Sequence, residues 1–197
     1  MIFFFQLLGA GALSLLIGLS SANYAIERGL GFAAVKRGSW VSWTRAGTQN
    51  SDPYTDAVFA HSGELPPIGE SVLVFSASTD DLGQALRAGC DYRIGGTAPP
   101  AQYWTFVAYN AATGKTLVPE DKRSGFSSAE IIYRVDGSFE IAMSQEPQPA
   151  NWSALPGTIS SETPVRMFLR LYDTPVSFGR DLAQAELPRI VRERCRT

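Results

Sequence analysis

The chain has 197 residues, a length that suits one domain of ordinary size and a shorter additional segment. Its 17 basic and 19 acidic residues leave a formal charge of −2, so no nucleic-acid partner is expected, and a hydrophobic content of 45% excludes a wholly disordered chain. The single histidine, His61, and two cysteines are too few for a histidine-cluster or thiolate metal site, and no metal or cofactor is expected.

Residues 1–25 predict one membrane-spanning helix. The sequence is apolar from Ile2 to Leu19 and has no charged side chain before Glu27. About 20 helical residues are enough to cross the hydrocarbon core of a bilayer. Two interpretations remain open, a signal peptide cleaved near the small residues 20–22 and a retained anchor. We favour a signal anchor that stays in the lipid bilayer, because the apolar run is long and no basic segment precedes it.

One face of this helix carries small residues every fourth position, and a glutamine extends the row by one turn. Small residues let two membrane helices approach closely, and a glutamine can form a hydrogen bond between them. The pattern therefore allows contact with a membrane-protein partner, although small residues are also frequent in membrane helices in general. The residues of this row are Gln6, Ala10, Ser14, Gly18 and Ala22.

The orientation of the helix is not settled by charge alone. Basic residues near the helix lie only on its C-terminal side, at Arg28, Lys36, Arg37 and Arg45, and the positive-inside rule would place that side in the cytoplasm. The cysteines favour the opposite orientation, because disulfides persist in oxidising compartments. We follow the cysteines and expect a single-pass membrane protein with its soluble domain on the side of the membrane away from the cytoplasm.

Residues 26–50 form a lead-in segment, and residues 51–197 are expected to form the folded domain. Trp40 and Trp43 suggest a short edge strand within the lead-in, with core packing as their more probable role. Asp52, followed by a proline, is typical of a helix start, and the helix should end near His61. The position of this histidine at a helix end accounts for it without a catalytic role.

Short segments rich in β-branched and aromatic residues follow, separated by turn signals. The dipeptide Asp136-Gly137 is the strongest of these signals, because a two-residue hairpin turn needs positive φ angles. Strands at this spacing without intervening helices predict an antiparallel sandwich or barrel, not a parallel α/β sheet. The predicted strands are 71–77, 90–94, 103–109, 129–135, 138–144 and 165–172.

Alternation along these strands suggests a sheet face on which arginines are interleaved with aromatic side chains. The candidates are Arg93, Arg134, Arg166 and Arg170. Guanidinium groups pair with carboxylates and phosphates, so such a face could bind an anionic or sugar-like ligand. We favour the alternative that these arginines form local ion pairs with Glu130, Glu140 or Asp173.

The loop at 147–156 carries a tryptophan, Trp152, for which two roles are open. An exposed indole can stack on a ligand or a partner, and it can also turn back to cover one end of a sandwich. The second role is the more common one, and we favour it.

The two cysteines are expected to form a disulfide. Cys90 begins a predicted strand, and Cys195 lies in the charged tail at 181–197. Outside the cytosol these thiols would oxidise together if the fold brings them close. The bridge would enclose roughly a hundred residues, for which loop entropy gives about 4–5 kcal/mol of stabilisation, and it would tether the tail to the sheet.

From about residue 38 onward the sequence resembles a bacterial family known as domain of unknown function 1214. The resemblance implies a jelly-roll-like β-sandwich in the cell envelope, of the short, membrane-anchored alphaproteobacterial type. Together with the cysteines, it leads us to expect a single-pass protein of the bacterial inner membrane with its soluble domain in the periplasm. No activity is agreed for this family, so the resemblance does not identify catalytic residues in this chain. Many relatives read Asn-Trp-Leu-Pro where this chain has two additional residues between Trp152 and Leu155. The matching segments are 52–54, 81–83, 90–94, 99–101 with Trp104, 136–139, 149–152 with Pro156, and 169–172.

Three functional hypotheses follow. The first is a non-catalytic envelope module that binds a partner or ligand, and the second is a small accessory subunit of a larger inner-membrane complex. The third is an enzyme that acts on a saccharide-like substrate, which would need two carboxyl groups close together. Asp80 with Asp81, or Glu140 with an acid on a neighbouring strand, are the candidates for that pair.

Overall fold

The computed structural model describes residues 2–27, 34–62, 66, 72–117, 123, 125–174 and 186–196. Arg28, Ser71 and residues 181–185, which the sequence arguments used, lie outside the described residues. Contacts divide the chain into two compact units, one of Met1–Ala34 with Arg45–Ile68 and one of Val35–Thr44 with Gly69–Thr197. The boundaries expected at residues 25 and 50 remain predictions, because contact density does not test independent folding.

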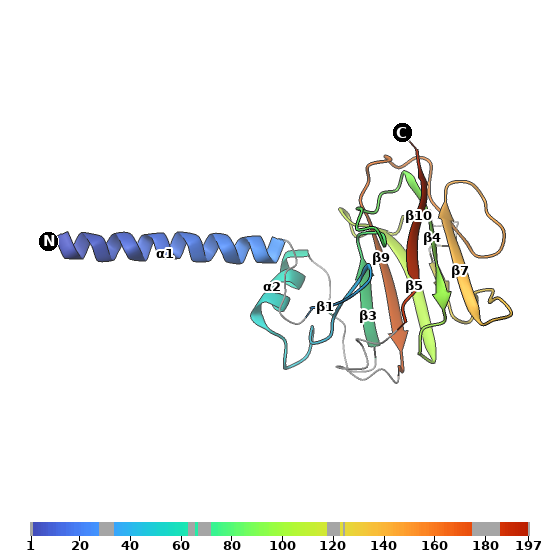
Figure 1. The fold of residues 1–197 in the computed structure, drawn as a ribbon, viewed down its shortest axis with the longest axis horizontal. Helices are drawn as coiled ribbons and strands as arrows, with labels where there is room; N and C mark the ends of the chain where they lie inside the picture. Colours follow the sequence, from blue (N-terminus) through green and yellow to red (C-terminus); the bar gives the residue numbers. More distant parts are fainter. Residues whose placement is uncertain are drawn as a thin grey trace. The chain divides into compact units, whose positions relative to one another are not determined.

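The first unit contains two helices. Helix α1 (Ile2–Glu27) has 26 residues, and its 1.5 Å rise per residue gives a length of about 39 Å. Its mean hydropathy of 1.8 and its length qualify it as a membrane anchor or a signal sequence. The described side chains from Phe3 to Ser21 are all exposed, whereas Ala22, Ala25 and Ile26 near the C-terminal end, where α1 contacts helix α2 (Pro53–Ser62), are partly buried. Figure 1 shows α1 as a long single helix. The predicted N-terminal apolar helix is therefore confirmed.

Helix α2 (Pro53–Ser62) begins where the sequence predicts. The Asp52 carboxylate accepts hydrogen bonds from the N–H groups of Tyr54 at 3.1 Å and Thr55 at 3.0 Å, which caps the helix. The Thr55 hydroxyl also donates to this carboxylate, and these bonds hold the pKa of Asp52 below its ordinary value. His61 lies in the last turn and is exposed.

The second unit contains two β-sheets (Figure 1). The larger sheet has the order β1 (Ala34–Arg37), β2 (Trp40–Trp43), β3 (Val72–Ala77), β9 (Val165–Tyr172), β5 (Tyr103–Asn110), β6 (Gly125–Ser127). The smaller has the order β10 (Arg189–Cys195), β4 (Cys90–Thr97), β7 (Ser138–Ser144), β8 (Trp152–Ala154). The mostly β architecture is confirmed, whereas the jelly-roll connection stays an expectation.

The two sheets enclose one hydrophobic core. Every second side chain of a strand points to the same face of its sheet, and the side chains on the inward faces are mainly apolar. The rings of Trp104 on β5 and Phe139 on β7 lie 4.8 Å apart and join the sheets. Each apolar side chain of this size that is fully buried stabilises the fold by about 1.5–3 kcal/mol. Other core residues include Leu73 and Phe75 on β3, Leu169 and Leu171 on β9, and Tyr92 and Ile94 on β4.

Three sequence predictions about the sheets are wrong. Residues 129–135 do not form a strand, and only Tyr133 makes an isolated bridge, to Phe139. The Asp136-Gly137 turn is present, with Gly137 at φ 78°, but it does not connect two strands. The sheets are also not wholly antiparallel, because β7 and β8 pair in parallel.

Candidate functional site

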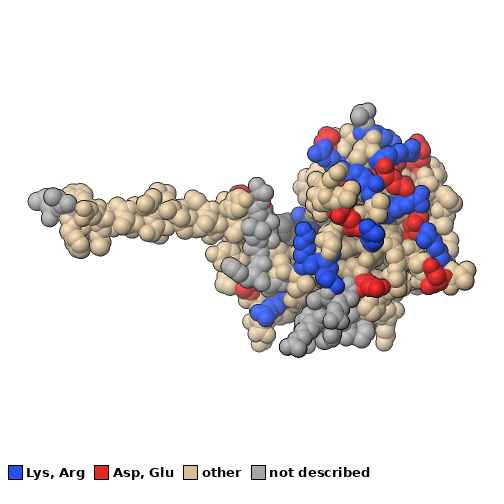
Figure 2. Space-filling view, viewed as in Figure 1, with Lys and Arg blue, Asp and Glu red and all other residues tan. Residues whose placement is uncertain are grey.

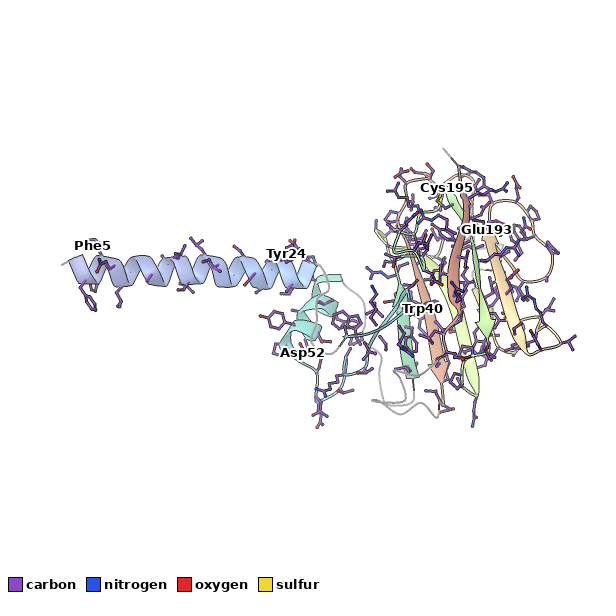
Figure 3. All side chains as sticks on the ribbon, in the orientation of Figure 1. Phe5, Tyr24, Trp40, Asp52, Glu193 and Cys195 are labelled. Carbon is purple, nitrogen blue, oxygen red and sulfur yellow. A yellow bond between two sulfur atoms is a disulfide. The ribbon has the colours of Figure 1, made fainter. Side chains whose placement is uncertain are left out.

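The C-terminal segment is a strand and not a loose tail. Strand β10 pairs antiparallel with β4, and the register places Cys195 opposite Cys90. A disulfide joins these two residues, which are 105 positions apart in the chain. Figure 3 shows Glu193 and Cys195 on β10 near the end of the chain. The fold thus contains the bond that the sequence suggested and also pairs the tail with the sheet.

Two aspartates bind β10 to the loop that follows β3. Asp80 is 2% exposed, and its Oδ1 accepts hydrogen bonds from backbone N–H groups while Oδ2 lies 2.9 Å from Nε of Arg192. Oδ1 of Asp81 accepts from the hydroxyl of Ser39 at 2.7 Å and from the N–H of Ile190 at 3.3 Å. The pair proposed for catalysis therefore serves as a structural connection.

A second buried carboxylate lies on β4. Asp91 is 3% exposed, and its Oδ2 lies 2.6 Å from Nε of Arg194. Arg196 places Nη1 3.0 Å from Oδ1 and Nη2 3.1 Å from Oδ2. Hydrogen bonds to Asp91 and then Glu146 raise the pKa of Arg194. Two guanidinium groups compensate the cost of burying this charge, so the cluster holds the strand end in place.

The structure does not bring the four candidate arginines together, so the expectation of one shared face is wrong. Arg93 lies on β4 and Arg134 in the segment before β7, whereas Arg166 and Arg170 lie on β9 of the other sheet. Strands β4 and β9, which carry three of these arginines, belong to different sheets. Periodicity gives the face of each strand but cannot assign strands to sheets.

Arg93 and Arg134 form the local ion pairs that the sequence analysis favoured. Arg93 lies 2.5 Å from Oε1 of Glu140 and also contacts Glu193, and Nη2 of Arg134 lies 2.9 Å from Oε2 of Glu140. Burial alone would raise the pKa of Glu140, but hydrogen bonds from both arginines outweigh it and lower the pKa. Figure 2 shows acidic and basic side chains interleaved on the visible surface of the sheets.

Arg166 and Arg170 lie on the outward face of the six-stranded sheet. The guanidinium of Arg170 lies 5.3 Å from the centre of the Phe168 ring, and Tyr109 meets the same ring edge-on at 5.4 Å. Tyr103, 41% exposed, packs against Tyr172 at 5.6 Å. We define the arginine–aromatic face by the six partly exposed residues Tyr103, Tyr109, Arg166, Phe168, Arg170 and Tyr172.

Trp152 makes the contacts expected for the covering role, and stacking of its ring on a ligand stays a prediction. It is half-buried on β8, and its Nε1 donates to the carbonyl of Ser144 at 3.2 Å and to the hydroxyl of the same residue at 3.1 Å. On α1, the row Gln6, Ala10, Ser14, Gly18 and Ala22 is exposed, with the Ser14 hydroxyl bonded to the carbonyl of Ala10 at 2.8 Å. Contact of this row with a partner helix stays a prediction.

Two of the cavities among the described residues are candidate ligand sites. One of about 520 Å³ is lined by residues 100–102 with Asp173 and Thr174. The other, of about 310 Å³, lies beside the disulfide and is lined by Gln84, Ala85, Arg87, Gly89, Cys90, Ser161, Glu162, Arg192, Cys195 and Arg196. Each has a single lining carboxylate, so neither offers the pair that glycoside hydrolysis needs. Over the same part of the chain, no group of three metal-binding side chains is present.

The predicted site residues did not include Arg192 and Arg194 of β10, or Arg196, which follows this strand. Arg192, Arg194 and Arg196 alternate through a segment that also contains Ile190 and Val191, which is a strand pattern. That alternation was the available signal. A charged segment at the chain end is otherwise typical of a frayed tail.

Comparisons with known proteins agree with this architecture. A family model described as "Protein of unknown function (DUF1214)" matches residues 71–176. The VPA0106 protein from Vibrio parahaemolyticus has a similar fold, with 18% identity and a TM-score of 0.58 over 96% of this chain and 46% of that one. An uncharacterised Burkholderia cenocepacia protein matches at 16% identity and a TM-score of 0.41, over 87% of this chain and 38% of that one. No curated protein matches.

Proposed function

The chain belongs to the DUF1214 family of proteins of unknown function, and we propose that it is a membrane-tethered, non-catalytic interaction module of the bacterial cell envelope. Helix α1 would anchor it in the inner membrane as a single span. The Cys90–Cys195 disulfide supports a periplasmic position for the sheets, because thiols in the cytosol are kept reduced.

The arginine–aromatic face is the observation that supports a binding role. It combines two arginines with tyrosines and a phenylalanine, the residue types enriched in protein–protein interfaces and among their hot spots. Its rings pack on one another and on Arg170, so little side-chain entropy would be lost when a partner covers them.

Site-specific photo-crosslinking in living cells tests this proposal. A photoreactive phenylalanine analogue at Tyr103, which is 41% exposed, should yield one defined protein adduct. The same analogue at Leu82, which is 83% exposed and outside the face, is the matched control and should yield none. Arg170→Glu should remove the adduct without changing the amount of folded protein. Adducts of the same mass from both positions would refute the proposal.

A second candidate is the small accessory subunit of an inner-membrane complex. The chain spans less than half of the Vibrio parahaemolyticus protein that it resembles, 46% of that chain. The small-residue row of α1 is the surface on which such a partner helix would pack.

Matched substitutions on α1 test the subunit hypothesis. Ala10→Ile lies in the row and Ala12→Ile lies two residues away, on another face of the helix, with the same change in volume and hydropathy. The first should abolish co-purification of a partner in mild detergent, and the second should preserve it. Equal co-purification with both variants would exclude this contact surface.

A further inference from the structure

The cleft beside the disulfide has an unusual lining. Both cysteines border it, together with the guanidinium-bearing side chains of Arg87, Arg192 and Arg196 and one acid, Glu162. Cys195 is exposed and Cys90 is 3% exposed, so one end of the bond is open to solvent and the other is buried. The volume, about 310 Å³, is at the lower end of the range of small-molecule sites.

We propose that this cleft is a thiol–disulfide exchange site for small anionic thiols, those that carry a carboxylate or sulfonate group. The thiolate of the ligand attacks Sγ of Cys195, and a new S–S bond forms there. The Cys90–Cys195 bond breaks, and its electron pair leaves with Cys90 as a thiolate. The sheets thereby take up a reversible covalent modification at Cys195.

The charges around the cleft favour an anionic ligand. The acid that lines it, Glu162, pairs with Arg87, and both side chains are largely exposed, at 71% and 48%. The carboxylates that compensate Arg192 and Arg196 belong to Asp80 and Asp91, which are buried and do not line the cleft. Electrostatic interactions weaken with distance, so we expect the arginines that line the cleft to outweigh the two acids that do not line it, and to favour a negatively charged ligand.

Contacts other than the disulfide keep the exchange reversible. Ion pairs from Arg192 to Asp80, and from Arg194 and Arg196 to Asp91, hold β10 against β4 on their own. The backbone N–H of Arg196 also donates to the carbonyl of Gly89 at 2.9 Å. The released Cys90 thiolate thus stays beside the mixed disulfide and closes the bond again when free thiol is removed.

Three small thiols of different charge test the proposal on the full-length protein in neutral detergent micelles. The probes are 2-mercaptoethanesulfonate, 2-mercaptoethanol and cysteamine, which are anionic, neutral and cationic. Intact mass spectrometry after acid quenching follows opening of the bond. For each thiol, the rate at which the Cys90–Cys195 bond opens is divided by the thiolate concentration. It is then divided by the rate, corrected in the same way, at which that thiol opens a neutral model disulfide. We expect the anionic thiol to exceed the cationic one by at least about fivefold at low salt, and the ratio to approach one near 1 M salt.

Substitutions that remove one charge from an exposed residue should shift the anionic-to-cationic rate ratio in opposite directions. Arg87→Gln should lower the anionic-to-cationic ratio at least about twofold, and Glu162→Gln should raise it by a similar factor. Lys36→Gln removes the same charge from the edge strand β1 and should leave the ratio unchanged. A wild-type ratio near one at low salt, equal effects of Arg87→Gln and Lys36→Gln, or a native disulfide that none of the three thiols opens would each overturn the proposal.

Discussion

The side-chain amide of Asn151 forms hydrogen bonds with both backbone groups of Ile132, its N–H and its carbonyl. Its Oδ1 accepts a hydrogen bond from the N–H of Ile132 at 2.7 Å, and its Nδ2 donates to the carbonyl of the same residue at 2.9 Å. Nδ2 also donates to the carbonyl of Glu140 at 2.9 Å. Asn151 is 4% exposed, and Ala150 before it has φ 64°, a conformation that L-residues other than asparagine and aspartate rarely adopt. One side chain thus replaces the strand partner that this segment lacks.

Replacement of Asn151 should therefore destabilise the sheets. Asn151→Ala leaves three backbone groups without their partner, which should cost about 2–3 kcal/mol of unfolding free energy. Asn110→Ala is the matched control, since this side chain accepts hydrogen bonds only within its own exposed turn, and a loss below about 1 kcal/mol is expected. Thermal unfolding of the full-length protein, followed by near-ultraviolet circular dichroism, gives both values. Equal losses would contradict the structural role of Asn151.

Asn151 also shows where prediction from the sequence ended. Strands β3, β4, β5, β7 and β9 were predicted because alternation and turn residues are local properties of the chain. Residues 129–135 alternate in the same way but form no strand, and the backbone N–H and carbonyl of Ile132 bond to the side chain of the distant Asn151. Strand β8 has three residues, too few to show a period. The ion pairs of Asp80 and Asp91 depend on β10 pairing with β4, which no local pattern reveals.

Loss of the disulfide should have a large effect on stability. The bond closes a loop across 105 positions, and the loop-entropy relation gives about 4–5 kcal/mol for this length. The double variant Cys90→Ala, Cys195→Ala should unfold at a clearly lower temperature, because loop entropy acts on the unfolded chain, whereas β10 should stay paired with β4 in the folded protein through its ion pairs. An unfolding temperature equal to that of the oxidised wild type would contradict this expectation.

Acid should weaken the outward face of the four-stranded sheet through Glu140. The folded protein holds the pKa of this carboxyl below its ordinary value of 4.5, so the charged form stabilises the fold above that pH. This contribution disappears as the pH falls through the lowered pKa. Glu140→Gln should therefore flatten the dependence of unfolding temperature on pH below about 4.5. Glu162→Gln is the control, because its ion pair is exposed and contributes little. Identical pH profiles for the wild type and Glu140→Gln would contradict this assignment.

Gly125 on β6 allows close approach of two strands. A Cβ atom at this position would lie 2.2 Å from the carbonyl oxygen of Phe106 and 2.8 Å from Cγ2 of Val107. Backbone atoms cannot yield as a flexible side chain can, so Gly125→Ala should lower the unfolding free energy by about 2–3 kcal/mol. The nearest atom to a Cβ at Gly157 is 3.8 Å away, and Gly157→Ala should be nearly neutral. Comparable unfolding temperatures for the two variants would show that β6 separates from β5 without cost.

The orientation of the chain in the membrane is the prediction on which the proposed location depends. Alkaline phosphatase fused after residue 197 should be active, because that enzyme needs the oxidising periplasm to form its own disulfides. Green fluorescent protein at the same position should be dark. Lys36, Arg37 and Arg45 on the C-terminal side of α1 oppose this orientation, so Phe3→Lys, which adds a positive charge on the other side, should increase the exported fraction. A fluorescent fusion with inactive phosphatase would place the sheets in the cytoplasm, where the Cys90–Cys195 bond would not persist.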